Sequence, residues 1–167
     1  MAQKFEWQPR PSSIQVYSDS GFAGCRRTRK SITGVAIMIG KYCLATRCKN
    51  QSVIALSSVE AELYAAVLAC SMGIGTRQMY EDLGLEMKVQ IYMDATAGIA
   101  MMKRQGLGSV KHVATQYLWI QELVHNKGVE LRKVPTDENY ADLMTKSLAE
   151  APMNYVLGRM GFVVPMT

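Results

Sequence analysis

The segment 55–69 constrains this chain more than any other part, because it predicts a long helix carrying one carboxylate that the helix itself does not need. Ser57 and Glu60 have the spacing of a capping box, in which each side chain accepts a backbone N–H of the first helical turn. Glu62 points about 200° around the helix from Glu60. It lies among small residues that let another layer approach closely: Ala61, Ala65, Ala66 and Ala69. A carboxylate on such a face indicates a functional site.

The composition is that of a globular domain. The chain has 167 residues, of which 49% are hydrophobic and 20% charged, so it is long enough to bury a core and is not a disordered chain. The net charge of +5 suits a polyanionic partner but does not by itself require one.

Nothing in the sequence predicts a zinc site or a membrane segment. The four cysteines form no CxxC pair, and neither histidine completes a zinc spacing, so reduced thiols are expected. The N-terminus lacks the apolar core of a signal peptide, and the longest apolar run, 35–39, is too short to cross a bilayer. We therefore expect an intracellular protein, cytoplasmic or nuclear.

Apolar periodicity and turn residues predict an α/β fold, with helices packed against a mixed sheet. Strands are expected at 13–19, 33–39, 42–49, 89–93 and from 129 to 133. Helices are expected at 58–83, 95–104, 111–126 and 137–148, the first bent or broken by Gly73 and Gly75 and the last capped by Thr136. Residues 1–13 are predicted to be a leader, 14–148 one domain, and 149–167 a tail with a short helix.

Four acidic residues stand where a site can form: Asp19 at a strand end, Glu62 on the long helix, Asp94 after a strand, and Asp142 in the last helix. Singly, each has an ordinary explanation, such as a turn, an N-cap, a solvated side chain or an ion pair with Lys146. Together they can converge at one edge of the sheet, where they would repel one another unless cations lay between them. Hard oxygen ligands select Mg²⁺ or Mn²⁺, and two such ions can catalyse phosphodiester cleavage, so the pattern predicts a nuclease.

Several motifs occur in an order that closely resembles the ribonuclease H domain of Ty1/copia-type retrotransposon Pol polyproteins. They are Tyr17-Ser18-Asp19, the segment 28–34, the segment 55–62, Lys111-His112, and 134–146 with Ala141-Asp142. The resemblance covers residues 14–163. It implies a ribonuclease H-like fold, with a five-stranded mixed sheet and helices on both faces. It also implies hydrolysis of the RNA strand of RNA–DNA hybrids and a reverse transcriptase domain as a partner.

The same resemblance implies a catalytic set of four carboxylates that binds two Mg²⁺ ions, with Mn²⁺ as an alternative. Asp19, Glu62, Asp94 and Asp142 fill all four positions, both as catalytic residues and as metal ligands. The chain departs from the family at Phe22, where many relatives have tryptophan, and at Leu118-Trp119, where relatives often have a second histidine. For His112, a capping or packing role is favoured over proton transfer, because it stands where a helix is expected to begin.

Basic residues near these carboxylates are candidates for holding the substrate, because a hybrid is recognised through its phosphates and 2′-hydroxyl groups. One group follows Asp19 directly and a second flanks the glycine-containing connection after Asp94. The predicted substrate-binding residues are Ser18, Arg26, Arg27, Arg29, Lys30, Lys103, Arg104 and Lys111.

Two other functions remain as alternatives. The chain can be a catalytically weak module that binds hybrids or serves as a scaffold for a reverse transcriptase, although no expected carboxylate is missing. An integrase- or resolvase-like nuclease is the other alternative, since related sheets carry that chemistry. Integrases of the DDE type place the glutamate last, whereas Glu62 is the second carboxylate here, which disfavours an integrase.

Overall fold

The computed structural model of the chain describes residues 2–104 and 114–163. Its strands are β1 (Ala2–Gln3), β2 (Ser13–Gly21), β3 (Ile32–Ile39), β4 (Tyr42–Asn50), β5 (Lys88–Met93), β6 (Glu130–Lys133) and β7 (Phe162–Val163). Its helices are α1 (Ser58–Asp82), α2 (Thr96–Lys103), α3 (Ala114–His125), α4 (Asp142–Thr145) and α5 (Glu150–Arg159), with a 3₁₀ turn, η2 (Thr136–Glu138), before α4.

Five strands form one mixed sheet in the order β4-β3-β2-β5-β6, which confirms the predicted sheet. Strands β2, β3 and β4 pair antiparallel, whereas β5 pairs parallel with both β2 and β6. It follows that β2, β4, β5 and β6 all end at the same edge of the sheet. Side chains that follow these strands can therefore meet there.

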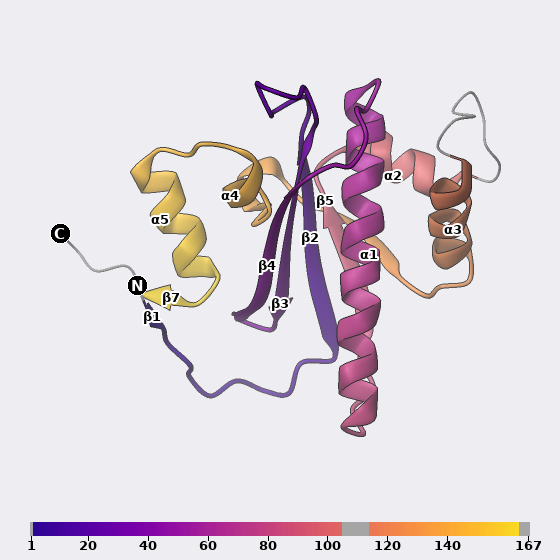
Figure 1. Cartoon of the computed structure of the whole chain (residues 1–167). Coiled ribbons are helices and arrows are strands. Elements are labelled where there is room, and N and C mark those ends of the chain that lie inside the picture. The colour runs from indigo at the N-terminus through magenta and orange to yellow at the C-terminus, as the bar shows by residue number, and fades with distance from the viewer. Residues whose placement is uncertain (1, 105–113, 164–167) are drawn as a thin grey trace.

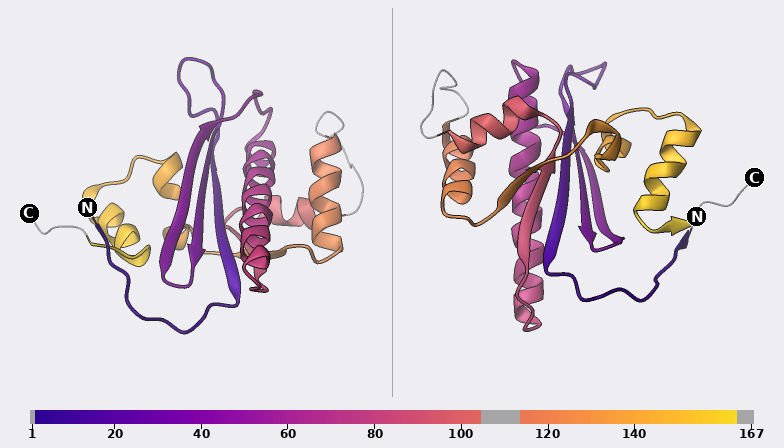
Figure 2. Two further views of the ribbon diagram at one scale, coloured as in Figure 1. Left: turned by 60° about the horizontal axis from the view of Figure 1, so that its bottom comes forward. Right: turned by 180° about the vertical axis from the view of Figure 1, so that it is seen from behind.

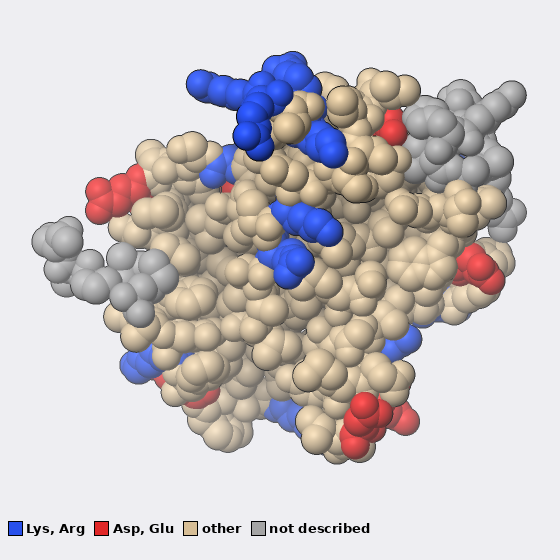
Figure 3. Space-filling model, viewed as in Figure 1, with Lys and Arg blue, Asp and Glu red and all other residues tan. Residues whose placement is uncertain are grey.

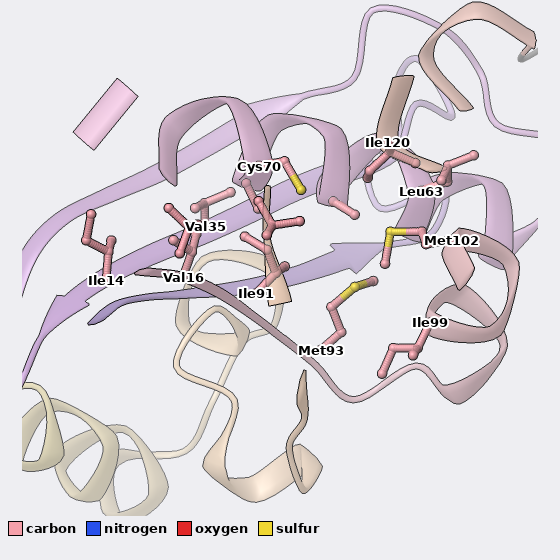
Figure 4. Close-up of a cluster of buried hydrophobic side chains, with 14 of the residues drawn as sticks. Ile14, Val16, Val35, Leu63, Cys70, Ile91, Met93, Ile99, Met102 and Ile120 are labelled. Atoms are coloured by element: carbon pink, nitrogen blue, oxygen red, sulfur yellow. The ribbon is translucent and has the colours of Figure 1, made fainter. Parts of the chain in front are cut away.

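Helices cover both faces of the sheet, as predicted (Figure 1). Helices α1, α2 and α3 lie on one side and α4 and α5 on the other, and the two further views in Figure 2 show the same separation. The larger core lies under α1, where Val16, Ile91 and Leu63 are buried with α2 and α3 side chains (Figure 4). The smaller core, with Tyr17 and Met160, lies under α4 and α5. Strand β2 contributes side chains to both cores, so the residues at its C-terminal end have a fixed position in the fold.

Helix α1 differs from the prediction, because it runs without a break through Gly73 and Gly75. A Cβ atom at Gly73 would lie 2.8 Å from Val89 Cγ1 and 3.0 Å from Val16 Cγ2, so this glycine lets the helix lie directly on the sheet. The predicted small face is confirmed in the same way, since Ala61, Ala65, Ala66 and Ala69 are fully buried. Gly73 therefore allows close packing of α1 on the sheet and does not bend the helix.

The predicted helix 137–148 is wrong, and so is its predicted cap. The segment forms the turn η2 and the single-turn helix α4, and Thr136 makes no capping bond. The buried Asn139 lies between them, where its Nδ2 donates to the Ser18 carbonyl at 3.1 Å and its Oδ1 accepts from the Ala141 N–H at 3.2 Å. These bonds fix the backbone to β2 and prevent a continuous helix.

Both ends of the described chain meet beside α5. Residues 1–13 were predicted to be a leader, but within them Ala2–Gln3 form a short strand, β1, that pairs antiparallel with Phe162–Val163 of β7. The short helix predicted in the tail is present as α5. Within the described residues, no helix combines the length and apolar character needed to cross a membrane. The four cysteines are free.

Candidate metal centre

Three of the four predicted carboxylates lie together at the edge where the strands end. One oxygen from each of Asp19, Asp94 and Asp142 lies within 4.8 Å of the others. Asp19 comes from the end of β2, Asp94 directly follows β5, and Asp142 begins α4. Asp19 and Asp142 are buried and Asp94 is half-buried, so the cluster faces a partly desolvated space. Asp94 does not cap α2, whose N-cap Ala95 makes no side-chain bond, so that alternative is wrong.

Glu62 lies beside this group of three and approaches from the other face of the sheet. Its Oε1 accepts a hydrogen bond of 2.8 Å from Ser20 Oγ. Consecutive strand residues point to opposite faces, so Asp19 faces α4 while Ser20 faces α1 and reaches Glu62. The serine half of the predicted capping box is present at the start of α1, because Ser57 Oγ accepts from the Glu60 N–H at 3.1 Å, and Glu60 Oε2 accepts from the Leu56 N–H at 2.8 Å.

A glycine on β3 allows α4 to approach the site. Gly34 lies opposite Asp19 in the β2–β3 ladder. A Cβ atom at this position would lie 2.7 Å from the Ala141 carbonyl and 2.8 Å from Thr145 Cγ2, which are distances that real Cβ atoms do not reach. Any larger residue would move α4, and with it Asp142, away from Asp19.

Each carboxylate is oriented by a side chain from a different part of the site, and the sequence analysis identified none of the hydroxyl partners. Besides the Ser20 bond to Glu62, Thr136 Oγ1 donates to Asp94 Oδ2 at 2.9 Å, and Thr145 Oγ1 donates to Asp19 Oδ2. The partner of Asp142 is Lys146, whose Nζ lies 2.8 Å from Asp142 Oδ2 and 3.7 Å from Asp19 Oδ2. Asp142 therefore forms the ion pair with Lys146 that the sequence suggested, and it also belongs to the carboxylate cluster.

Burial and mutual repulsion make Glu62 and Asp142 hard to ionise without a cation. Burial raises the pKa of Glu62 to about 7, and the neighbouring charges of Asp19 and Asp94 add to the shift against the hydrogen bond from Ser20. Burial also raises the pKa of Asp142 to about 6, with Asp19 adding to the shift and Lys146 opposing it. Such shifts mark a place where a bound cation would be strongly favoured.

The free oxygens of the site fit a divalent metal. Glu62 Oε2 and Asp142 Oδ1 are buried and have no hydrogen-bond partner among the described residues. An all-carboxylate set of hard oxygen ligands suits Mg²⁺ or Mn²⁺ rather than softer metals. The Lys146 ammonium already neutralises part of the cluster, which shows that this position attracts positive charge.

The predicted substrate-binding residues have different outcomes. Arg26, Arg27 and Arg29 are exposed on the loop after β2, and Lys30 in the same loop donates from Nζ to the Ser52 carbonyl at 2.7 Å. Lys103 and Arg104 are exposed at the end of α2. Lys111 and His112 lie outside the described residues. Ser18 is fully buried and, by strand alternation, points to the α1 side of the sheet, so its predicted contact with substrate does not fit the structure.

Sequence comparison finds retrotransposon polyproteins. The chain is 33% identical over 135 residues to the retrovirus-related Pol polyprotein from transposon TNT 1-94 of Nicotiana tabacum, which covers 80% of this chain and 10% of that protein. It is 24% identical over 152 residues to the Pol polyprotein from transposon RE1 of Arabidopsis thaliana, which covers 89% of this chain and 10% of that protein. The chain thus spans about a tenth of these relatives. No family model matches it.

Structure comparison finds ribonucleases H. LC11-RNase H1, isolated from compost, superposes with a TM-score of 0.57 at 21% identity, covering 80% of this chain and 92% of that one. The same protein in complex with an RNA/DNA hybrid superposes with a TM-score of 0.54 at 20% identity, covering 79% and 93%. The chain therefore has the ribonuclease H fold, as predicted. Together with the Pol relatives, this confirms the resemblance to the ribonuclease H domain of a copia-type Pol polyprotein.

Proposed function

We propose that this chain is a metal-dependent endoribonuclease that hydrolyses the RNA strand of RNA–DNA hybrids. The observation that carries the proposal is the carboxylate cluster itself: three aspartate oxygens within 4.8 Å of one another, with Glu62 beside them. The ribonuclease H fold and the retrotransposon relatives support the same activity. The hybrid bound by LC11-RNase H1 is the substrate we assign to this chain.

The residues of the site have separate roles in this proposal. Asp19, Glu62, Asp94 and Asp142 would hold two Mg²⁺ ions, with Mn²⁺ as a substitute, and the free oxygens of Glu62 and Asp142 support direct ligation. When bound, the ions supply an activated water and stabilise the charge on the attacking and leaving oxygens. Ser20, Thr136 and Thr145 fix the orientation of three of these carboxylates, which keeps the ligand geometry set before the substrate arrives.

The same comparisons support the proposed partners. The relatives are Pol polyproteins, so we assign to the chain a reverse transcriptase domain as partner and removal of template RNA during reverse transcription as its role. Arg26, Arg27, Arg29 and Lys30 would contact phosphates, because they follow β2 at the edge of the sheet that carries the carboxylates.

The first test is cleavage of a labelled RNA–DNA hybrid with Mg²⁺, beside duplex RNA and duplex DNA. We expect cleavage of the hybrid alone, in the RNA strand, and its loss on addition of EDTA. Asp94→Asn should lower the rate by about 10²–10³-fold, as loss of one stabilising group for transition-state charge does in other enzymes.

Asp82→Asn is the matched control, because Asp82 ends α1 far from the cluster and an asparagine there still accepts the bond from Gln78. It should cleave like the original chain. Hybrid binding without cleavage, under all metal conditions, would contradict the proposal and support the alternative of a hybrid-binding module.

A further inference from the structure

The charges of this chain are unevenly distributed along the sequence. Residues 20–59 contain seven of the 19 lysines and arginines and none of the 14 aspartates and glutamates. Six of these cations lie toward the edge of the sheet that carries the carboxylates, on the loop after β2 or in the second half of β4. This segment therefore forms a positive region next to an acidic centre.

Two of these cations belong to the outer strand β4 and were not among the predicted substrate-binding residues. Arg47 lies opposite Val35 and Lys49 opposite Thr33 in the β3–β4 ladder, so both point to the α1 side of the sheet. Residues 46–50 are all exposed. The space-filling view shows blue side chains gathered over the loop after β2 and continuing below it across this face, with no red among them (Figure 3).

We call Arg47 and Lys49, with the loop cations Arg26, Arg27, Arg29 and Lys30, the basic track. Within the described part of the chain, none of the six forms an ion pair with a carboxylate. Their charges therefore remain available. Lys30 links the two halves of the track, because its Nζ donates to the carbonyl of Ser52, just after β4.

The basic track also borders a groove, and this distinguishes it from a flat charged surface that only contacts solvent. A groove of about 280 Å³ lies between the end of β4 and α1, and Lys49 forms part of its rim. Its wall includes the side chains of Tyr64, Val67 and Leu68. At its base the buried amide of Gln51 donates to Thr33 Oγ1 and to the Ala61 carbonyl, while its Oε1 has no partner among the described residues.

We propose that the basic track binds the phosphate backbone of the hybrid beside the scissile bond, with one nucleotide seated in the groove next to Lys49. This inference rests on the proposed function, because it takes the hybrid as the ligand. Strands in a sheet lie about 4.8 Å apart, so β4 is about 10 Å from the strand that carries Asp19. One strand of a duplex rises about 3.4 Å for each phosphate, so about 10 Å corresponds to about three nucleotides. Cations on β4 can therefore contact phosphates a few nucleotides from the scissile one.

The test measures binding separately from cleavage. Fluorescence anisotropy of a labelled hybrid in EDTA, over a series of KCl concentrations, gives the dependence of affinity on salt. The variant is Arg47→Gln with Lys49→Gln. The control is Lys41→Gln with Lys88→Gln, which removes the same charge from the opposite end of the sheet, at the β3–β4 turn and the start of β5. Circular dichroism and thermal unfolding confirm that both variants fold.

We expect the track variant to bind the hybrid more weakly and its salt slope to fall by about 2, one for each lost phosphate contact. The control variant should keep the original slope. Equal slopes for the track variant and the original chain would overturn the inference, as would equal losses in both variants, which would indicate net charge alone. Normal binding by the original chain without cleavage would contradict the proposed function and leave this test unaffected.

Discussion

The carboxylates of the centre depend on neighbours that are distant in sequence. Ser20 orients Glu62, Thr136 orients Asp94, and Thr145 orients Asp19. Each hydroxyl occupies one side of a carboxylate and leaves other lone pairs for a cation. Partners of metal ligands of this kind fix ligand orientation and change metal affinity when they are removed.

Thr136 offers a clean test of this orienting role, because it is exposed and its replacement leaves no cavity in the core. Thr136→Val keeps the shape of the side chain and removes the donor to Asp94. We expect the Mg²⁺ concentration for half-maximal cleavage to rise by about tenfold, the lower end of the range for such partners. A Mg²⁺ titration of hybrid cleavage measures the change, and calorimetric titration with Mn²⁺ checks it without turnover.

Thr136→Ser is the matched control, because it restores the hydroxyl and should recover most of the original metal dependence. If Thr136→Val and the original chain have the same Mg²⁺ dependence, then the Thr136 hydrogen bond does not organise the site.

At the scale of elements, local sequence was a good guide where local rules decide the structure. The five strands of the main sheet, the start of α1 and its small face follow from alternation, capping and residue size, and all were predicted within a few residues. The helix predicted at 137–148 is wrong because Asn139 bonds to β2, more than a hundred residues away in sequence. The partners Ser20, Thr136 and Thr145 were missed for the same reason: only the fold brings them to the carboxylates.

The two glycines of α1 show how tertiary contacts override helix propensity. Gly73 is buried against Val16 and Val89, whereas a Cβ atom at Gly75 would meet nothing within 4 Å. Gly73→Ala should lower the free energy of unfolding by about 1–2 kcal/mol, because overpacking a close contact outweighs the gain in helix propensity. Gly75→Ala should raise it by about 0.5–1 kcal/mol, because alanine favours the helix and nothing opposes it.

Urea unfolding of the two variants, followed by circular dichroism, measures both changes. Opposite signs at two sites only two residues apart are the expected result. A stabilising Gly73→Ala would mean that α1 lies farther from the sheet than the structure shows.

For the whole molecule, the acidic centre is a source of instability that a metal can relieve. The site collects Asp19, Glu62, Asp94 and Asp142 at one edge, while the cations of the basic track lie to the side and do not pair with them. Lys146 alone, among the described residues, bridges two of the four carboxylates. Without metal, the carboxylates of the folded chain repel one another, and binding of cations to the folded chain should offset this repulsion.

This repulsion predicts a particular dependence of stability on pH. Burial raises the pKa of Glu62 from 4.5 to about 7 and that of Asp142 from 3.8 to about 6, so the folded chain holds protons that the unfolded chain has released. Stability from these two groups is therefore fully present below about pH 4 and is lost as pH rises through about 6 to 7. In EDTA, the chain should lose on the order of 1–3 kcal/mol between pH 4.5 and 8 from this source.

Glu62→Gln separates this effect from other titrating groups, because glutamine keeps the hydrogen-bonding shape of a neutral glutamate and cannot ionise. In EDTA, urea unfolding at several pH values should show a smaller loss of stability toward pH 8 for this variant than for the original chain. Adding Mg²⁺ at pH 8 should stabilise the original chain more than the variant, since the variant lacks one ligand. Parallel pH profiles for the two proteins would show that Glu62 ionises as readily in the folded chain as in the unfolded one, and the raised pKa would then be excluded.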